Sequence, residues 1–210
     1  MTVEFYQDHK FLFKHAKKSV KKFLPRSKQI TVVLFIDLTN SVLNKMKIGS
    51  SNAISQTLFH NKICKLIIEY NGGKVITEVG DAVIAVFASL TTACDCALNI
   101  IYNFKKYDDT IATKASISVG SVEIVTVGKS TAIYGLPVDL CARMMRRVCK
   151  NSIILEESNY SEISQFINKK YIEVKKPHIA DLKSFGNIRL REIRPFFRKT
   201  LYSSSKKVSV

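Results

Sequence analysis

The spacing of apolar residues along the chain predicts alternating strands and helices. Short runs of apolar or alternating residues, bounded by Gly, Asn or Asp, are typical of β-strands. Longer stretches with apolar residues three and four positions apart are typical of amphipathic helices. The predicted strands cover residues 30–37, 74–87 (a hairpin), 113–119, 122–127, 152–155, 170–174 and 188–193. The predicted helices cover about residues 51–70, 90–104, 138–148 and 156–166.

This order of elements predicts the fold class. A strand, a helix, a hairpin, a helix and further strands describe an α+β domain in which helices cover one mostly antiparallel sheet. The first part follows the pattern of a ferredoxin-like split βαβ core. We expect one such domain over residues 30–195, because the chain has 210 residues and shows no internal repeat.

The two ends of the chain differ from this domain. Residues 1–29 are rich in Lys, and Pro25 closes a segment whose apolar residues are spaced as on one helical face. We interpret it as a basic helical extension that packs on the domain or on a partner chain. A membrane-surface helix is the second interpretation. Residues 196–210 are predicted to be a flexible basic tail. The apolar residues of the extension are Phe5, Phe11, Phe13, Ala16, Val20 and Phe23.

Composition narrows the classes of protein. The sequence contains no CxxC pair among its five Cys, and a zinc site or a disulfide framework is not expected. We expect a cytoplasmic protein, since no apolar run is long enough to span a membrane and the first residues do not resemble a signal peptide. The net charge of +16 allows a nucleic acid, an anionic membrane surface or a polyphosphate ligand. No zinc-finger, helix-turn-helix or RNA-binding motif favours nucleic acid.

Two acids stand at the ends of predicted strands. Asp81 lies in the Gly-Asp turn of the hairpin, and Asp37 ends the first strand. Asp is common in turns, and by itself Asp81 is explained by turn geometry. If the two strand ends are neighbours, however, two carboxylates come together, and such a pair needs a cation such as Mg²⁺ or Mn²⁺. The turn after Asp37 has backbone N–H groups at Asn40, Ser41 and Val42 that suit phosphate oxygens. The residues thus indicate metal-dependent phosphoryl transfer.

Five motifs in order resemble those of class III nucleotidyl cyclase catalytic domains. Residues 35–38 match F-x-D-[IL], and residues 72–87 match the hairpin motif G-G-x-[VI]-x-x-x-x-G-D-x-[VIL]-x-[AV]-x-F. Residues 117–122 match I-x-x-G-x-[VI], residues 135–143 match G-x-x-V-N-x-A-x-R except at its Asn, and residues 182–186 match L-K-x-[FY]-G. The resemblance extends over about residues 30–194.

The resemblance implies a role for each matched residue. Asp37, Asp81 and the backbone carbonyl of Leu38 correspond to the ligands of two Mn²⁺ or Mg²⁺ ions. Arg143 corresponds to the arginine that stabilises the transition state, and Lys183 to the lysine that binds the triphosphate. In this family a head-to-tail homodimer completes each active site with residues of both chains. Without the motif, Arg143 would be interpreted as a solvated helix residue.

Three positions depart from the family. Purine cyclases read their base with side chains at the positions of Thr77 and Ala132, and neither residue matches the adenylate or the guanylate type. Asp139 replaces the motif Asn that orients the ribose, where it can still accept a hydrogen bond and where Arg143 stands one helical turn on. These changes resemble the stand-alone bacterial pyrimidine cyclases of Pycsar antiphage systems, whose product acts on a separate effector protein. Phe35 and Thr77 are candidates to line the pyrimidine pocket.

We therefore predict a homodimeric pyrimidine cyclase that converts UTP to cyclic UMP. Four alternatives stay open: cyclic CMP synthesis, a conventional adenylate or guanylate cyclase, an inactive nucleotide-binding domain of this fold, and a basic nucleic-acid-binding module. We expect a nucleoside triphosphate as the substrate, with neither nucleic acid nor a membrane as a partner.

Overall fold

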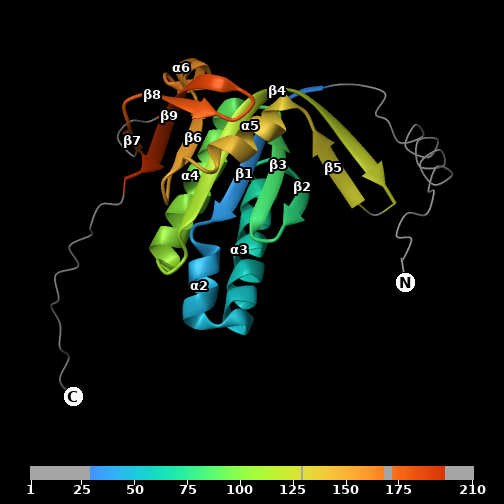
Figure 1. Ribbon diagram of the computed structural model, residues 1–210, viewed down its shortest axis with the longest axis vertical. Helices are drawn as coiled ribbons and strands as arrows, with labels where there is room; N and C mark the ends of the chain where they lie inside the picture. Colours follow the sequence, from blue (N-terminus) through green and yellow to red (C-terminus); the bar gives the residue numbers. More distant parts are fainter. Residues whose placement is uncertain (1–28, 129, 168–171, 197–210) are drawn as a thin grey trace, which may run out of the picture.

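One nine-stranded sheet organises the part of the chain that the computed structural model describes, which is residues 29–128, 130–167 and 172–196 (Figure 1). The strand order is β2-β3-β1-β4-β6-β9-β7, while β5 pairs with β4 and β8 pairs with β9. The β4–β6 pair is parallel and the other pairs are antiparallel. The predicted α+β class with a mostly antiparallel sheet is confirmed.

The bounds of the elements are as follows. The strands are β1 (Gln29–Leu38), β2 (Lys74–Val79), β3 (Ala82–Phe87), β4 (Thr113–Val127), β5 (Ser130–Tyr134), β6 (Ile153–Glu156), β7 (Ile172–Val174), β8 (His178–Leu182) and β9 (Gly186–Pro195). The helices are α2 (Ser41–Ile48), α3 (Ser50–Tyr70), α4 (Leu90–Tyr107), α5 (Leu136–Met144) and α6 (Glu157–Ile163).

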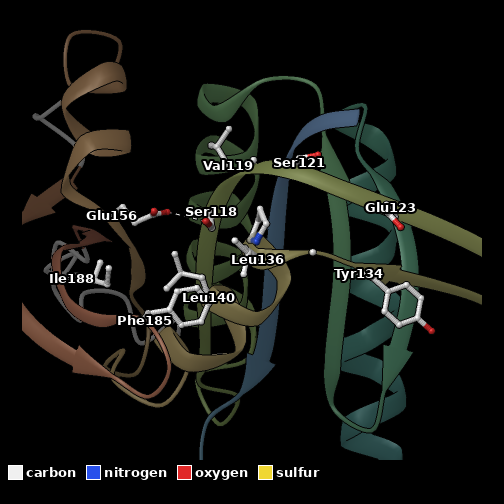
Figure 2. A pocket seen from close by; sticks show the side chains of 13 residues that line it. Ser118, Val119, Ser121, Glu123, Tyr134, Leu136, Leu140, Glu156, Phe185 and Ile188 are labelled. Atoms are coloured by element: carbon white, nitrogen blue, oxygen red, sulfur yellow. Dashed lines mark hydrogen bonds between the residues drawn. The ribbon is translucent and has the colours of Figure 1, made fainter. Parts of the chain in front are cut away.

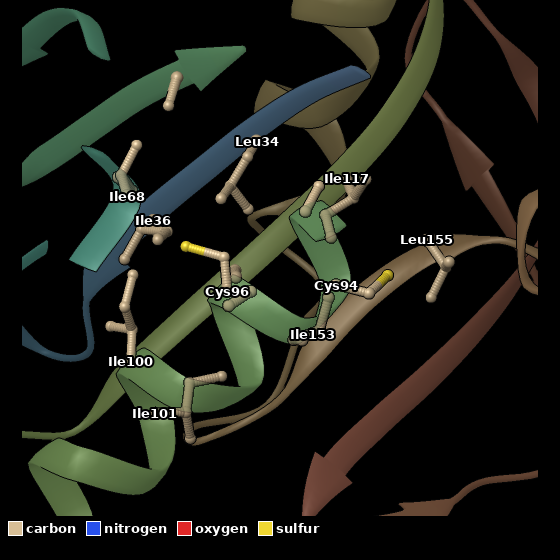
Figure 3. Packing of buried hydrophobic residues seen from close by; sticks show 14 of the residues in the cluster. Leu34, Ile36, Ile68, Cys94, Cys96, Ile100, Ile101, Ile117, Ile153 and Leu155 are labelled. Carbon is tan, nitrogen blue, oxygen red and sulfur yellow. The ribbon is translucent and has the colours of Figure 1, made fainter. Parts of the chain in front are cut away.

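The sheet separates two apolar clusters. On one face, residues of β1, β3 and β4 such as Leu34 and Ile117 pack against Ile68 of α3 and Ile100 of α4 (Figure 3). On the other face, Phe35 belongs to a second cluster that includes Leu140 of α5 and Leu182 of β8. Successive residues of β1 thus enter different clusters, because side chains alternate along a strand. Asp37 follows the alternation of Phe35 and lies on the α5 face of the sheet.

Several predicted bounds were wrong for local physical reasons. The residues after Asn40 form helix α2, which the pattern did not predict because none of its residues is buried. Residues 113–127 form one strand rather than two, and Gly120 lies inside it. Glycine is needed at this position because a Cβ would stand 2.8 Å from the Pro137 side chain. Val79, an apolar residue of the predicted hairpin, is 63% exposed. The short strands β5 and β8 were also missed.

The predicted extension and tail fall outside the described residues, apart from Gln29 and Phe196. The predicted strand over residues 170–174 is observed from Ile172, and the predicted helix over residues 156–166 is the shorter α6. In the described part of the chain, every helix is too short or too polar to cross a membrane.

Candidate active site

Asp37 and Asp81 lie side by side at one end of the sheet. Asp37 is the penultimate residue of β1, and Asp81 lies in the turn between β2 and β3, whose second strand pairs with β1. Burial and, after it, the charge of Asp81 raise the pKa of Asp37 above its usual range. Each carboxylate is half-buried. The pair therefore carries a repulsion that a cation would relieve.

The turn that carries Asp81 follows the geometry of a tight hairpin. Val79 pairs with Ala82, so the turn consists of Gly80 and Asp81 alone. Gly80 has a φ of 63°, whereas Asp81 is not among the residues with positive φ. Glycine at the first turn position is the requirement of a type II′ turn, and it fixes the direction of the residue that follows.

Lys114 supplies one positive charge to this pair. It faces Asp37 across the β1–β4 ladder, and its Nζ lies 3.5 Å from Asp37 Oδ2. The same ammonium group donates a hydrogen bond of 3.3 Å to the carbonyl of Met145, at the end of α5. The Lys114 charge lowers the pKa of Asp37, but burial and Asp81 outweigh it and the net shift is upward. Lys114 was not predicted, because only the strand register brings it to Asp37.

The chain after Asp37 forms the predicted strand-to-helix turn. Asn40 adopts the left-handed conformation (φ 59°, ψ 35°), which Asn tolerates better than most residues, and precedes the first helical turn of α2. The first helical hydrogen bond runs from the Asn44 amide to the Asn40 carbonyl at 2.9 Å. The amides of Ser41 and Val42 precede it and have no helical acceptor. They stand at a helix N-terminus, where partial positive charge favours phosphate.

A small cavity joins this turn to Asp81. Its volume is about 290 Å³, and Ser41, Val42, Lys45 and Asp81 contribute to its lining. The remaining lining residues are Gly80 and residues of α3, namely Ala53, Ile54, Thr57 and Leu58. The structure thus brings two of the predicted phosphate-binding residues and one predicted metal ligand to the same cavity.

The donors at this end of the sheet fit a hard divalent cation. The carboxylates of Asp37 and Asp81 and the carbonyl of Leu38 are oxygen ligands of the kind that Mg²⁺ and Mn²⁺ prefer. Two buried hydroxyl oxygens flank Leu38, Thr39 Oγ1 and Thr113 Oγ1, and neither has a hydrogen-bond partner in the described part of the chain. No three His, Cys, Asp or Glu side chains gather into one group among the described residues. Further ligands would come from water or substrate phosphates.

Arg143 and Asp139 lie on α5. Arg143 is half-buried and Asp139 is exposed. No ion pair joins Arg143 to Asp139, Asp37 or Asp81 in the described residues. Within the described part of one chain, Arg143 is therefore not ion-paired with the carboxylate pair.

Lys183 lies in the tight turn between β8 and β9. The Phe185 amide donates to the Leu182 carbonyl at 2.8 Å, and Ser184 takes a positive φ of 72°. Lys183 is exposed, and no ion-pair partner is found for it within the described ranges. Its ammonium group is thus presented outward on a short turn.

Two of the three predicted base-pocket residues share one face of the sheet. Phe35 and Thr77 both pair with Ile84, from β1 and from β2. A bulge between Val75 and Thr77 shifts the alternation of β2 and turns Thr77 to this face. Phe35 is only 8% exposed and belongs to the second cluster, so it would contribute to a pocket mainly as its floor.

Ala132, the third predicted base-pocket residue, lies on β5 next to Ile133. Ile133 packs into the second cluster, so Ala132 points to the opposite side of its strand. Although β5 contacts β2, the structure does not place Ala132 on the face that Phe35 and Thr77 share.

A larger cavity opens at the first turn of α5 (Figure 2). Its volume is about 640 Å³, and Leu136, Leu140 and Phe185 form much of its apolar wall. Glu156 faces it and accepts hydrogen bonds from Ser118 Oγ at 2.8 Å and from Asn159 Nδ2 at 2.9 Å. Burial raises the pKa of Glu156, although both hydrogen bonds oppose the shift. The sequence analysis did not single out Glu156. It stands between a strand and a helix, where acidic residues are common, and nothing in the sequence sets it apart from them.

Comparison with known proteins relates this geometry to one fold. No family model and no curated protein matches the sequence. The guanylate cyclase domain of RhGC from Catenaria anguillulae, solved in complex with GTP, is similar with a TM-score of 0.69 and 18% identity, over 81% of this chain and 100% of that chain. The adenylyl cyclase CyaB from P. aeruginosa is similar with a TM-score of 0.69 and 16% identity, over 82% of this chain and 98% of that chain. This chain has the class III cyclase catalytic domain fold.

A third structure supports the same assignment of fold. An adenylate/guanylate cyclase/hydrolase from Silicibacter pomeroyi gives a TM-score of 0.66 and 18% identity, over 81% of this chain and 99% of that chain. The cyclase fold of this chain therefore extends over nearly the whole of each similar domain.

Proposed function

We propose that the chain is a nucleotidyl cyclase that converts UTP to 3′,5′-cyclic UMP and pyrophosphate. The observation that carries the proposal is the pairing of Asp37 and Asp81 on a cyclase fold, beside the cavity that Ser41 and Val42 share with Asp81. Such a pair, next to amides suited to phosphate, is the arrangement that phosphoryl chemistry requires.

Asp37, Asp81 and the carbonyl of Leu38 would hold two divalent ions, Mn²⁺ or Mg²⁺. Bound ions of this kind supply Lewis-acid stabilisation of phosphate charge and a lower pKa for the attacking hydroxyl. The fit rests on the oxygen donors, on the repulsion that raises the pKa of Asp37, and on the orphaned hydroxyls beside Leu38. Lys114 holds Asp37 in place from the neighbouring strand.

The reaction is an in-line displacement within one nucleotide. The ribose 3′-hydroxyl loses its proton to solvent water and its oxygen forms a bond to the α-phosphorus. The bond from that phosphorus to the bridging oxygen breaks, and pyrophosphate leaves with the electron pair. The amides from Asn40 to Val42 and the ammonium of Lys183 bind the triphosphate. Asp139 accepts a hydrogen bond from a ribose hydroxyl. Arg143 provides a fixed cation where negative charge develops in the transition state.

Two chains would complete each active site in a head-to-tail homodimer. The support is that, among the described residues of one chain, no ion pair joins Arg143 to Asp37 or Asp81, and that Asp139 and Lys183 are exposed. A second copy would present its Arg143, Asp139 and Lys183 to the carboxylates of the first. A two-fold dimer contains two such sites.

The base preference is inferred from Thr77 and Ala132. A site discriminates strongly between bases only by polar groups that the wrong base leaves unpaired. Thr77 offers one hydroxyl and Ala132 offers none, so neither residue can form the paired contacts of a purine reader. The absence of both purine-reading side chains favours a pyrimidine base, and CTP is the alternative within this class. The cellular role that accompanies such an enzyme is bacterial antiphage defence, with a separate effector protein that binds the product.

Adenylate or guanylate cyclase activity is the second candidate function. The similar structures favour it, since their names describe adenylyl and guanylyl cyclases. A domain that binds nucleotide without turnover is the third candidate, because Asp139 replaces the motif Asn. The assay below distinguishes it from an active cyclase.

The deciding experiment is incubation of the purified protein with each of the four nucleoside triphosphates and Mn²⁺, with products separated by chromatography and mass spectrometry. The proposal expects cyclic UMP as the dominant product and pyrophosphate in equal amount. Dominant cyclic AMP or cyclic GMP would replace it with the second candidate. Absence of any cyclic product would leave only nucleotide binding.

A further inference from the structure

A buried amide on α3 contacts the turn that carries Asp81. Asn61 is 5% exposed and donates both hydrogens of its amide group to the hairpin. One hydrogen bond, of 2.9 Å, goes to the backbone carbonyl of Gly80, and the other, of 3.1 Å, goes to Glu78 Oε2. Gly80 is the residue before Asp81, so this amide grips the turn at the peptide group that joins the two.

The orientation of the Asn61 amide is itself fixed. Its Oδ1 can only accept, so the contact of 3.1 Å with His60 Nδ1 is a hydrogen bond donated by the imidazole. The other ring nitrogen, Nε2, is then the acceptor for the Cys64 thiol at 3.5 Å. Burial lowers the pKa of His60 and raises that of Cys64, which keeps the ring neutral and the thiol protonated. Every polar atom of the Asn61 side chain is thus engaged.

The chain of contacts ends on the rigid part of the domain. The His60 ring stacks on Phe104 of α4, with ring centroids 5.2 Å apart and an interplanar angle of 22°. His60, Cys64 and Phe104 are all buried, and the latter two belong to the first apolar cluster. The members of this network on α3 and α4 are buried and paired, which makes them a rigid anchor for the carbonyl of the exposed Gly80.

We propose that Asn61 is a positioning residue for Asp81, which holds the Gly80–Asp81 turn in the orientation that the metal-binding carboxylate needs. The inference rests on the proposed function, in which Asp81 is a metal ligand. It does not require Asn61 to touch metal or nucleotide. Outer residues that orient a metal ligand through hydrogen bonds change metal affinity by about 10- to 100-fold when they are replaced. The amide of Asn61 acts on the backbone of the ligand-bearing turn in the same way.

The test compares replacements of two Asn residues, one in α3 and one directly after its last residue. Asn61→Leu removes the amide that grips the turn, while Asn71→Leu removes an amide that donates only within α3, from Asn71 Nδ2 to the Ile67 carbonyl at 2.7 Å. Binding of MnCl₂ alone is measured by titration calorimetry, and melting temperatures are measured in EDTA. We expect Asn61→Leu to bind Mn²⁺ at least about tenfold more weakly than the wild type and Asn71→Leu to bind it normally.

Two further variants keep the test decisive. Asn61→Ser is an alternative if Asn61→Leu does not fold, because a short hydroxyl cannot reach both acceptors. His60→Phe keeps an aromatic ring against Phe104 but frees the Asn61 amide, and we expect a weaker loss of Mn²⁺ affinity from it. Faster amide hydrogen exchange at Gly80 and Asp81 in these variants would report the freed turn without any metal.

The outcomes separate this inference from the proposed function. Wild-type Mn²⁺ affinity in folded Asn61→Leu or Asn61→Ser would overturn the positioning role of Asn61. In that case, a loss of Mn²⁺ binding in Asp81→Ala would still support the metal site. Wild-type Mn²⁺ affinity in Asp81→Ala would overturn the metal site and with it the inference. Weak Mn²⁺ binding in the Asn61 and Asp81 variants, with normal binding in Asn71→Leu, supports both.

Discussion

The two groups of candidate active-site residues differ in how far one chain completes them. We define the metal end as Asp37, Asp81 and the turn from Leu38 to Val42. Its two carboxylates are half-buried, and Lys114 and Asn61 hold Asp37 and the turn of Asp81. The cation side, which we define as Asp139, Arg143 and Lys183, lies on α5 and on the β8–β9 turn without ion-pair partners among the described residues. In the proposed homodimer, the cation side receives its partners from the second chain.

The contrast also separates two kinds of pre-organisation. The metal end is fixed by contacts within one chain. Asn61 of α3 binds the Gly80–Asp81 turn, and Lys114 of β4 pairs with Asp37 of β1. The cation side is fixed only in its backbone, by helix α5 and by the tight turn at Ser184. Variants at the metal end should therefore change metal affinity and stability in a single chain, whereas variants at the cation side should change only turnover and substrate binding.

The largest expected effect comes from Asp81→Ala. Metal ions supply several kcal/mol of transition-state stabilisation, so we expect cyclic nucleotide formation to fall by about a thousandfold or more. The melting temperature in EDTA should not fall, because the variant removes a repulsive charge. Product formation is measured by chromatography at saturating Mn²⁺. Turnover near that of the wild type would remove Asp81 from the mechanism.

Arg143→Ala tests the cation side. Loss of one group that stabilises developing charge costs about 10²–10³ in kcat. We expect that fall with little change in the KM for the nucleotide and no change in Mn²⁺ affinity, since Arg143 has no contact with the metal end of its own chain. Arg146→Ala, which replaces an exposed arginine just after α5, is the matched control. A loss of Mn²⁺ affinity in Arg143→Ala would contradict the division into two groups.

Lys183→Ala should have a smaller effect. An exposed ammonium group that binds a phosphate contributes about 1.5–3 kcal/mol at most, and we expect the KM to rise by about tenfold while kcat changes little. Steady-state kinetics over a range of nucleotide concentrations distinguishes the two parameters. Lys176→Ala removes another lysine from the same part of the chain as a control. A fall in kcat with an unchanged KM would show instead that Lys183 stabilises the transition state rather than the bound nucleotide.

The smallest effect concerns stability and pH. Burial and Asp81 raise the pKa of Asp37 in the folded chain, so the ionised form lowers the free energy of unfolding once the pH rises above the usual Asp range. We expect metal-free Asp37→Asn to melt a few degrees above the wild type at neutral pH, since 1 kcal/mol corresponds to about 2–4 °C in a chain of this size. The difference should vanish below about pH 4, where both states of the wild type are protonated. Melting curves in EDTA check this, and a lower melting temperature in Asp37→Asn would contradict it.

The sequence pointed to Asp37 and Asp81 as a pair because its signals are local. Gly80-Asp81 is a turn dipeptide between two apolar strands, and Asp37 ends a strand that is buried on both faces. The side-by-side position of Asp37 and Asp81 depended on the two strand ends being neighbours, and the β1–β3 pairing makes them so. Lys114 and Asn61 were not predicted, since one depends on the β1–β4 register and the other on how α3 packs over the hairpin. Neither residue stands in a motif.

The missed elements have similar causes. Helix α2 buries none of its residues, so it carries no apolar stripe that a pattern could reveal. The exposed ends of β5 and the short β8 lack the alternation of a core strand. Gly120 indicated a turn, but its lack of a side chain serves the close approach of Pro137 to β4. The base preference depends on Thr77, whose face is set by a bulge that the sequence does not show.

The central claim, that two chains share each active site, is tested most directly by mixing inactive variants. Asp81→Ala and Arg143→Ala are combined, unfolded and refolded together, and assayed with UTP and Mn²⁺. Half of the dimers formed at random contain one chain of each kind, and each of these has one intact site, so we predict about a quarter of wild-type activity. A mixture of Asp37→Ala and Asp81→Ala, which share the metal end, should stay inactive. No recovery in the first mixture, or equal recovery in both, would contradict the account.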